Sequence, residues 1–106
     1  MPVSAGIYYS LSQSKLTDGL PVVLLHGAGG MHLSWPSEVR RMAGYWVYAL
    51  DLPGHGKSQE IGGQQTIVGY ARQVLACLDA INVGRAVFVG HSMGSAVALT
   101  LALHHP

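Results

Sequence analysis

Three short runs of continuously apolar residues divide the sequence, at residues 21–25, 45–50 and 86–89. A run that is apolar at every position suits a strand buried on both faces, as in a parallel sheet covered by helices on either side. A further β-prone segment, residues 7–11, precedes them and ends at a polar stretch. The pattern therefore predicts four strands, with residues 21–25 in the middle of a parallel sheet.

Helical patterns follow the three apolar runs. Ser34 is suited to an N-cap and Pro36 to a first helical turn, which predicts a helix ending near Met42. From Thr66, apolar residues recur with a period near 3.6, at Ile67, Ala71, Val74, Leu75, Leu78 and Ile81. Residues 95–103 are apolar almost all round, so we expect that helix to be buried. Alternating strands and helices indicate an α/β fold, with a parallel sheet flanked by helices.

Composition narrows the class of protein. The 106 residues fit one domain at most, and 49% of them are apolar while only 10% are charged. The net charge is +1 and no basic run is present, which argues against a nucleic-acid partner. Cys77 is the only cysteine, so the chain has no internal disulfide. Residues 1–20 lack the pattern of a signal peptide, and the longest apolar run is too short for a membrane span. These features favour a cytoplasmic protein.

The segment Gly90-His91-Ser92-Met93-Gly94 reads G-x-S-x-G, between a predicted strand and a predicted helix. This is the context that a nucleophile elbow requires, in which a serine sits at the apex of a sharp turn. Such a turn brings backbone atoms close together, and glycines two residues before and after the serine leave room for them. With 14 glycines in the chain a chance match is the alternative, but the flanking elements argue against it. We predict that Ser92 is a nucleophile.

Two further glycine-rich segments follow predicted strands. Residues 24–30 read Leu-Leu-His-Gly-Ala-Gly-Gly, and residues 51–58 read Asp-Leu-Pro-Gly-His-Gly-Lys-Ser. The end of the second segment looks like a phosphate-binding G-x-x-x-x-G-K-[ST] loop. Asp51 stands where the first glycine of that loop belongs, however, and no helical pattern begins before Thr66. We therefore reject a nucleotide-binding function.

Together the three segments resemble the α/β-hydrolase superfamily, with its serine esterases and lipases, and the likeness covers essentially the whole chain. Residues 24–30 are similar to the family's H-G loop, and residues 51–58 to its D-x-x-G-x-G-x-S loop. The resemblance implies that the oxyanion of the reaction is held by the N–H groups of Met93 and Ala28, with Gly27 as the alternative to Ala28. Losing one such donor lowers the rate by roughly 10²–10³.

The resemblance also implies that Gly27, Gly29 and His91 border the substrate, and that residues 51–58 support and line the pocket. It implies no metal and no organic cofactor. The alternative for residues 27–30 is a flexible turn without a catalytic role. Trp35 and His32 are further pocket residues, for which packing is the favoured interpretation.

A serine hydroxyl needs a base, usually a histidine oriented by a carboxylate. The resemblance places the acid after the sixth or seventh strand and the histidine after the eighth, whereas this sequence stops after the helix that follows the fifth. We therefore expect residues 1–106 to be the N-terminal, incomplete half of one hydrolase domain. The histidines already present are poor candidates for the general base. His26 is expected to be a scaffold residue, and His104 and His105 lie roughly 18–20 Å from Ser92 along the last helix.

The expected activity is hydrolysis of a carboxylic ester through an acyl-enzyme on Ser92. Lactones, small amides, thioesters and carbon–carbon bonds of diketones stay open as substrates, because one fold hosts them all. A serine at the apex argues against dehalogenases and epoxide hydrolases, which use aspartate there. The alternative is a non-catalytic hydrolase-like fragment or binding module. A second polypeptide could complete the sheet, whose edge at residues 87–89 is uncharged and expected to associate.

Overall fold

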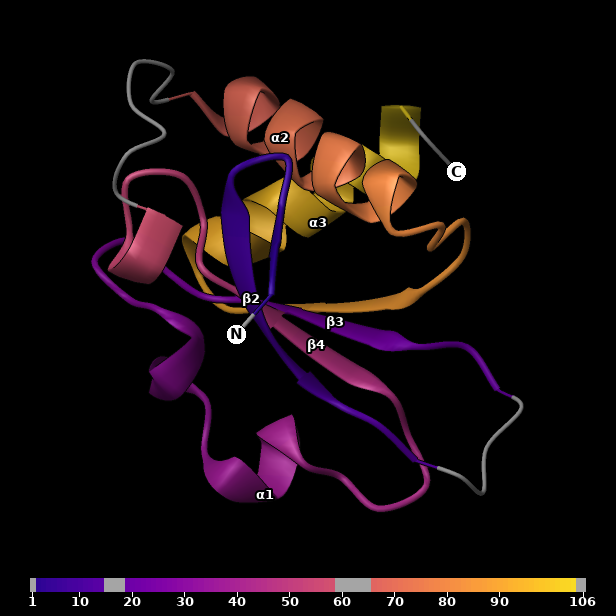
Figure 1. Ribbon diagram of the computed structural model, residues 1–106. Helices are drawn as coiled ribbons and strands as arrows, with labels where there is room; N and C mark the ends of the chain where they lie inside the picture. Colours follow the sequence, from indigo (N-terminus) through magenta and orange to yellow (C-terminus); the bar gives the residue numbers. More distant parts are fainter. Residues whose placement is uncertain (1, 15–18, 59–65, 105–106) are drawn as a thin grey trace.

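The computed structural model describes residues 2–14, 19–58 and 66–104 (Figure 1). Within these residues, a five-stranded mixed sheet has the order β1-β2-β4-β3-β5. The strands are β1 (Val3–Ser4), β2 (Ile7–Ser12), β3 (Val22–Leu25), β4 (Val47–Leu50) and β5 (Val87–Gly90). All four predicted strands are confirmed, and β1 is an addition.

The centre of the sheet is parallel and its N-terminal side is antiparallel. Strand β3 pairs in parallel with β4 on one side and with β5 on the other. Strand β2 runs antiparallel to β4, and β1 folds back onto β2 through a two-residue turn. Ala5 and Gly6 in that turn both have positive φ, of 49° and 81°, as tight hairpins require. The parallel sheet expected from the sequence therefore describes only β4, β3 and β5.

The helices lie on both sides of the sheet. They are η1 (His32–Ser34), α1 (Ser37–Arg40), η2 (Gly56–Ser58), α2 (Ile67–Ala80) and α3 (Met93–His104), where η marks a short 3₁₀ helix. Helices α2 and α3 pack on one face, and α1 lies on the other (Figure 1). None of the helices in the described residues is long and apolar enough to span a bilayer.

The first predicted helix is wrong in extent, whereas the second is confirmed. Helix α1 is only four residues long, and Pro36 occupies its N-cap position without a capping side chain. Ser34 lies in η1, where its Oγ accepts a hydrogen bond from the Met31 N–H at 3.0 Å. Helix α2, in contrast, begins directly after Thr66, whose Oγ1 accepts from the Gly69 N–H at 2.9 Å.

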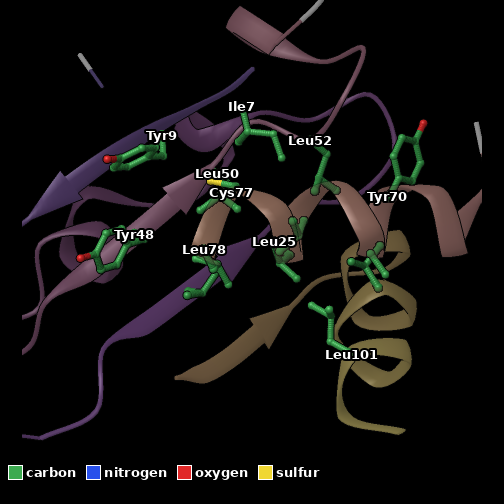
Figure 2. Close-up of a cluster of buried hydrophobic side chains, with 14 residues drawn as sticks. Ile7, Tyr9, Leu25, Tyr48, Leu50, Leu52, Tyr70, Cys77, Leu78 and Leu101 are labelled. Atoms are coloured by element: carbon green, nitrogen blue, oxygen red, sulfur yellow. The ribbon is translucent and has the colours of Figure 1, made fainter. Parts of the chain in front are cut away.

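Strands β3 and β4 are buried on both faces because each face meets a separate hydrophobic cluster. The larger cluster lies between the sheet and helices α2 and α3, and Figure 2 shows Leu25, Leu50 and Leu78 within it. The smaller cluster joins Val22, Leu24, Val47 and Ala49 to side chains beside α1. This double cover explains why the two strands read as unbroken apolar runs.

The expectation that the last helix is buried holds for one side of it only. Of its residues only Gly94, Val97 and Leu101 are buried, whereas Leu99 and Leu103 are 60% and 68% exposed. One side of α3 packs on β5, β3 and α2, and in the described residues no element covers the opposite side. The apolar sequence thus predicts that the helix packs against other elements. Which of its sides is buried depends on where those elements lie.

Candidate active site

The turn between β5 and α3 has the geometry of a nucleophile elbow. Strand β5 ends at Gly90 and α3 begins at Met93, so that only His91 and Ser92 connect them. Ser92 adopts φ 54°, a conformation that costs energy for a residue with a Cβ. Its side chain is exposed. The His91 N–H donates to the Leu25 carbonyl at 3.0 Å and ties the turn to the end of β3.

The two motif glycines are required by close backbone contacts. A Cβ added to Gly94 would overlap the carbonyl oxygen of Leu25, so the first turn of α3 rests directly on the end of β3. A Cβ added to Gly90 would overlap the Gly94 carbonyl oxygen and lie 2.5 Å from the Ser95 nitrogen. The steric reason that the sequence suggested for the glycine spacing is confirmed.

Ser92 opens into a cavity of about 510 Å³. Residues 26–30 of the H-G loop, His91 and Ser92 line this cavity, together with Ser34, Trp35 and Pro36. Gly27 lies against the elbow, since a Cβ on it would be 3.2 Å from Ser92 Cβ and 3.1 Å from His91 Nδ1. The structure therefore brings the H-G loop and the elbow together around one space, as the sequence predicted.

Some expected pocket residues lie elsewhere. None of residues 51–58 lines the cavity, so the expectation that this loop forms part of the pocket wall is wrong. His32 is buried and hydrogen-bonded, which confirms the packing interpretation for that residue. Trp35 both lines the cavity and packs against the smaller hydrophobic cluster.

The backbone N–H groups of Ala28 and Met93 have no acceptor within the described residues, and neither do those of Gly27, Gly29 and Ser92, which line the cavity. The next two N–H groups of α3, of Gly94 and Ser95, donate to the carbonyls of His91 and Ser92 at 2.9 Å. Free amides at a helix start and in a glycine loop are suitable donors to a developing oxyanion. Their role in this chain stays a prediction.

The conformation of the H-G loop is fixed by hydrogen bonds. The Gly27 carbonyl lies 3.0 Å from the Gly30 N–H and 2.7 Å from His26 Nδ1. His26 Nε2 in turn accepts from the Leu52 N–H at 2.9 Å. Because an amide N–H can only donate, Nε2 carries no proton and Nδ1–H is the donor to Gly27. Burial lowers the pKa of the His26 ring, which favours the same neutral form. The expected scaffold role of His26 is confirmed.

The D-x-x-G-x-G-x-S segment is organised around the fully buried carboxylate of Asp51. Its Oδ1 accepts from the His32 N–H at 2.6 Å and lies 2.8 Å from His32 Nδ1. Its Oδ2 accepts from the Lys57 N–H at 2.9 Å. A Cβ on Gly56 would collide with this carboxylate, which explains the second glycine of the motif. The sequence motif identified this segment, but it did not predict the hydrogen bonds between Asp51 and His32, which are 19 residues apart.

Within the described residues, no histidine or carboxylate is hydrogen-bonded to the Ser92 hydroxyl. His91 shares the cavity, and its Nδ1 would lie 3.1 Å from a Cβ added to Gly27. His55 Nδ1 lies 3.0 Å from the Pro53 carbonyl, and His104 ends α3. The location of the general base therefore stays a prediction.

Comparison with known proteins agrees with this geometry. The model of the alpha/beta hydrolase fold family matches residues 21–106. A 2-hydroxy-6-oxo-6-phenylhexa-2,4-dienoate hydrolase of Comamonas testosteroni is 38% identical over 105 residues, which cover 92% of this chain and 36% of the relative. A (E)-2-((N-methylformamido)methylene)succinate hydrolase of Acinetobacter baylyi is 30% identical over 84% of this chain and 34% of its own length.

Solved structures give the same result. The enol-lactonase of Burkholderia xenovorans superposes with a TM-score of 0.79 at 26% identity, over 93% of this chain and 38% of the enzyme. Est816, described as an N-acyl homoserine lactone degrading enzyme, has a TM-score of 0.73 at 36% identity, over 94% of this chain and 38% of its own. The chain thus spans about a third of the length of the relatives it matches. By sequence and by structure, it belongs to the α/β-hydrolase family.

Proposed function

We propose that this chain carries the nucleophile and oxyanion part of a serine hydrolase site that acts on carboxylic esters. The observation that carries the proposal is Ser92 itself, held at positive φ between β5 and α3 and exposed to a cavity faced by the H-G loop. A buried serine or one within a regular helix could not attack a bound carbonyl. The strained turn presents the hydroxyl to solvent and substrate.

The proposed reaction has two stages. Ser92 Oγ attacks the ester carbonyl and loses its proton to a base, and the resulting oxyanion accepts hydrogen bonds from the Met93 and Ala28 N–H groups. The intermediate collapses to an acyl-enzyme and releases the alcohol, which takes up that proton. Water then attacks the acyl-enzyme by the same route and frees the carboxylic acid.

The base and its orienting acid are proposed to come from a segment beyond this sequence or from a second polypeptide. Two facts support this: no described histidine is bonded to Ser92, and the matched relatives are about three times as long. Removing the serine–histidine pair of a hydrolase lowers turnover by about 10⁶. The chain by itself is therefore expected to be nearly inactive.

The substrate proposal rests on the relatives' chemistry. Two of the matched structures belong to an enol-lactonase and to an N-acyl homoserine lactone degrading enzyme, and a lactone is a cyclic ester. The attack of a hydroxyl on an ester carbonyl is the step that the Ser92 geometry suits. Lactones are accordingly the first alternative to open-chain esters.

A fluorophosphonate probe tests the proposal, because it reacts with activated serines. We expect intact-mass and peptide analysis to place the label on Ser92, slowly in this chain and faster when a completing segment is supplied. The Ser92→Ala variant should not be labelled. Ser37→Ala is the matched control, since Ser37 is exposed on α1 and its hydroxyl donates to the neighbouring Glu38 carboxylate.

The rival function is a non-catalytic binding module that has kept the hydrolase scaffold. The same experiment separates the two functions. Failure to label the folded chain, with and without a completing segment, would favour the binding module and contradict the catalytic proposal. Labelling confined to a serine other than Ser92 would contradict it as well.

A further inference from the structure

Three hydrogen bonds join residues 26–32 to the segment after β4, and a fourth lies within the H-G loop; we call these four bonds the loop clasp. His26 Nε2 accepts from the Leu52 N–H at 2.9 Å, and His26 Nδ1–H donates to the Gly27 carbonyl at 2.7 Å. Asp51 Oδ1 accepts from the His32 N–H at 2.6 Å and faces His32 Nδ1 at 2.8 Å. The clasp thus holds the H-G loop near both of its ends.

The His26 part of the clasp acts on the proposed oxyanion donor through one peptide unit. The Gly27 carbonyl and the Ala28 N–H belong to the same planar peptide group, in which the C=O and N–H bonds point in opposite directions. His26 Nδ1–H and the Gly30 N–H both donate to that carbonyl. Fixing the carbonyl on one side therefore fixes the direction of the Ala28 N–H on the other.

The Leu52 bond exists only while the His26 ring is neutral. If Nε2 were protonated, its N–H would face the N–H of Leu52, and the two donors would repel each other. The buried Leu52 amide would then have no acceptor. The titratable groups around the ring have opposite effects on its protonation. His55, whose ring centroid lies 5.0 Å away, and His32 disfavour a positive charge on His26, whereas Asp51 favours it. Burial is the largest influence and also disfavours the charge, whereas the hydrogen bond to the Gly27 carbonyl, the second-largest influence, favours it.

We propose that His26 is a positioning residue for the Ala28 N–H, and that its protonation opens the loop clasp locally while the sheet stays folded. The positioning role rests on the proposed function, because it matters only if Ala28 holds an oxyanion. The opening itself does not depend on that function. Acid would then release the Leu52 side of the clasp before it unfolds the chain, while His26 Nδ1–H still donates to the Gly27 carbonyl.

The direction of the pH effect follows from linkage. In the opened loop His26 titrates near the ordinary histidine value of about 6.5, and in the closed loop its pKa is lower. The opened form therefore binds more protons in the window below about pH 6.5, so the closed form weakens there as the pH falls. Above that window the clasp keeps its full strength. Within the window the opening equilibrium rises by up to tenfold per pH unit.

Amide hydrogen exchange tests the opening. The protection factor of the Leu52 amide is compared with that of Leu24 in the core strand β3, between pH 7.5 and 5. We expect the Leu52:Leu24 ratio to fall by up to tenfold per pH unit below about pH 6.5. A ratio that stays flat over this range would overturn the proposal, and so would a parallel loss of protection at both amides.

Two variants of His26 separate the bond to Leu52 from the bond to Gly27. Both replace the ring with an amide side chain that does not titrate. His26→Gln places an acceptor near the position of Nε2, so Leu52 should stay protected with a flat pH profile. His26→Asn places a donor near the position of Nδ1 but leaves Leu52 without an acceptor, so Leu52 should exchange quickly at every pH. An acid-dependent slope in His26→Gln equal to that of the parent chain would contradict the assignment to His26.

A spectroscopic measurement on the unmodified chain keeps the proposal testable if the variants do not fold. Nitrogen NMR of the His26 ring should show the neutral tautomer with its proton on Nδ1. The amide resonance of Ala28 should then move with the titration of this ring. A ring protonated on Nε2, or an Ala28 amide that ignores the titration, would overturn the positioning role. Neither readout uses Ser92 chemistry, so failure here is distinct from failure of the hydrolase proposal.

Discussion

The β4–α2 and β5–α3 parts of the molecule start from the same arrangement and end differently. Both strands pair in parallel with β3, and in the same register along residues 22–25. All four residues of β4 are buried, whereas β5 alternates between exposed and half-buried positions. The reason lies in their neighbours: β4 has β2 on its other edge, and β5 pairs with β3 alone in the described part of the chain.

The connections that follow the two strands also differ. Sixteen residues, 51–66, separate β4 from α2, which begins at a conventional side-chain cap. Two residues separate β5 from α3, and that turn needs positive φ at Ser92 and two glycines in close contact. The comparison teaches that the well-covered part supplies stability, while the strained and less covered part presents the candidate chemistry.

The largest effect is expected from Gly94→Ala, at the start of α3. Its new methyl group would overlap the Leu25 carbonyl, which is backbone and cannot move aside. We expect the free energy of unfolding to fall by about 3 kcal/mol, as measured by urea denaturation. Alanine normally favours helices over glycine, so the expected sign is opposite to that of propensity alone.

Gly84→Ala is the matched control, because a Cβ there meets no atom within 4 Å. We expect its unfolding free energy to stay within about 0.5 kcal/mol of the parent chain. If Gly94→Ala were equally harmless, α3 would not rest on the end of β3 as described, and the strained elbow would lose its structural basis.

The next prediction compares two valines that occupy equivalent register positions on either side of β3. Val47 in β4 and Val87 in β5 both pair with Val22, but Val47 is 1% exposed and Val87 is 47% exposed. We expect Val47→Ala to lower the unfolding free energy by about 2 kcal/mol, through lost burial and a small cavity. Val87→Ala should lower it by less than about 1 kcal/mol.

Equal losses for the two valines would show that β5 is covered in solution. Repeating the denaturation at several protein concentrations, alongside sedimentation, then tests whether a second copy provides the cover. Because β5 pairs along one edge only within the described residues, association is the expected result at high concentration.

The smallest effect concerns the cap of α2. Thr66→Ala removes the oxygen that accepts from the Gly69 N–H and should lower the unfolding free energy by about 1 kcal/mol. Thr66→Ser keeps an acceptor and should restore most of that stability. A serine variant as unstable as the alanine variant would mean that the threonine methyl group, rather than the hydrogen bond, matters at this position.

Much of the fold and of the candidate site could be predicted from local patterns. The apolar runs located β3, β4 and β5, the 3.6-residue period located α2, and G-x-S-x-G located a turn that the structure shows to be strained. The H-G loop was expected beside Ser92, and the two do line one cavity. The short α1 was overestimated because Ser34 and Pro36 are compatible with more than one kind of turn.

The sequence by itself determined where the chain extends, coils and turns, because backbone periods and glycine requirements act over a few residues. Only the tertiary structure decided that β2 runs antiparallel, that one side of α3 stays exposed, and that Asp51 bonds to His32. It also decided that His26 accepts from the Leu52 N–H and donates to the Gly27 carbonyl, which belongs to the same peptide group as the Ala28 N–H. The physical reason is that pairing, burial and hydrogen-bond partners join residues far apart in the chain, and no local pattern records them.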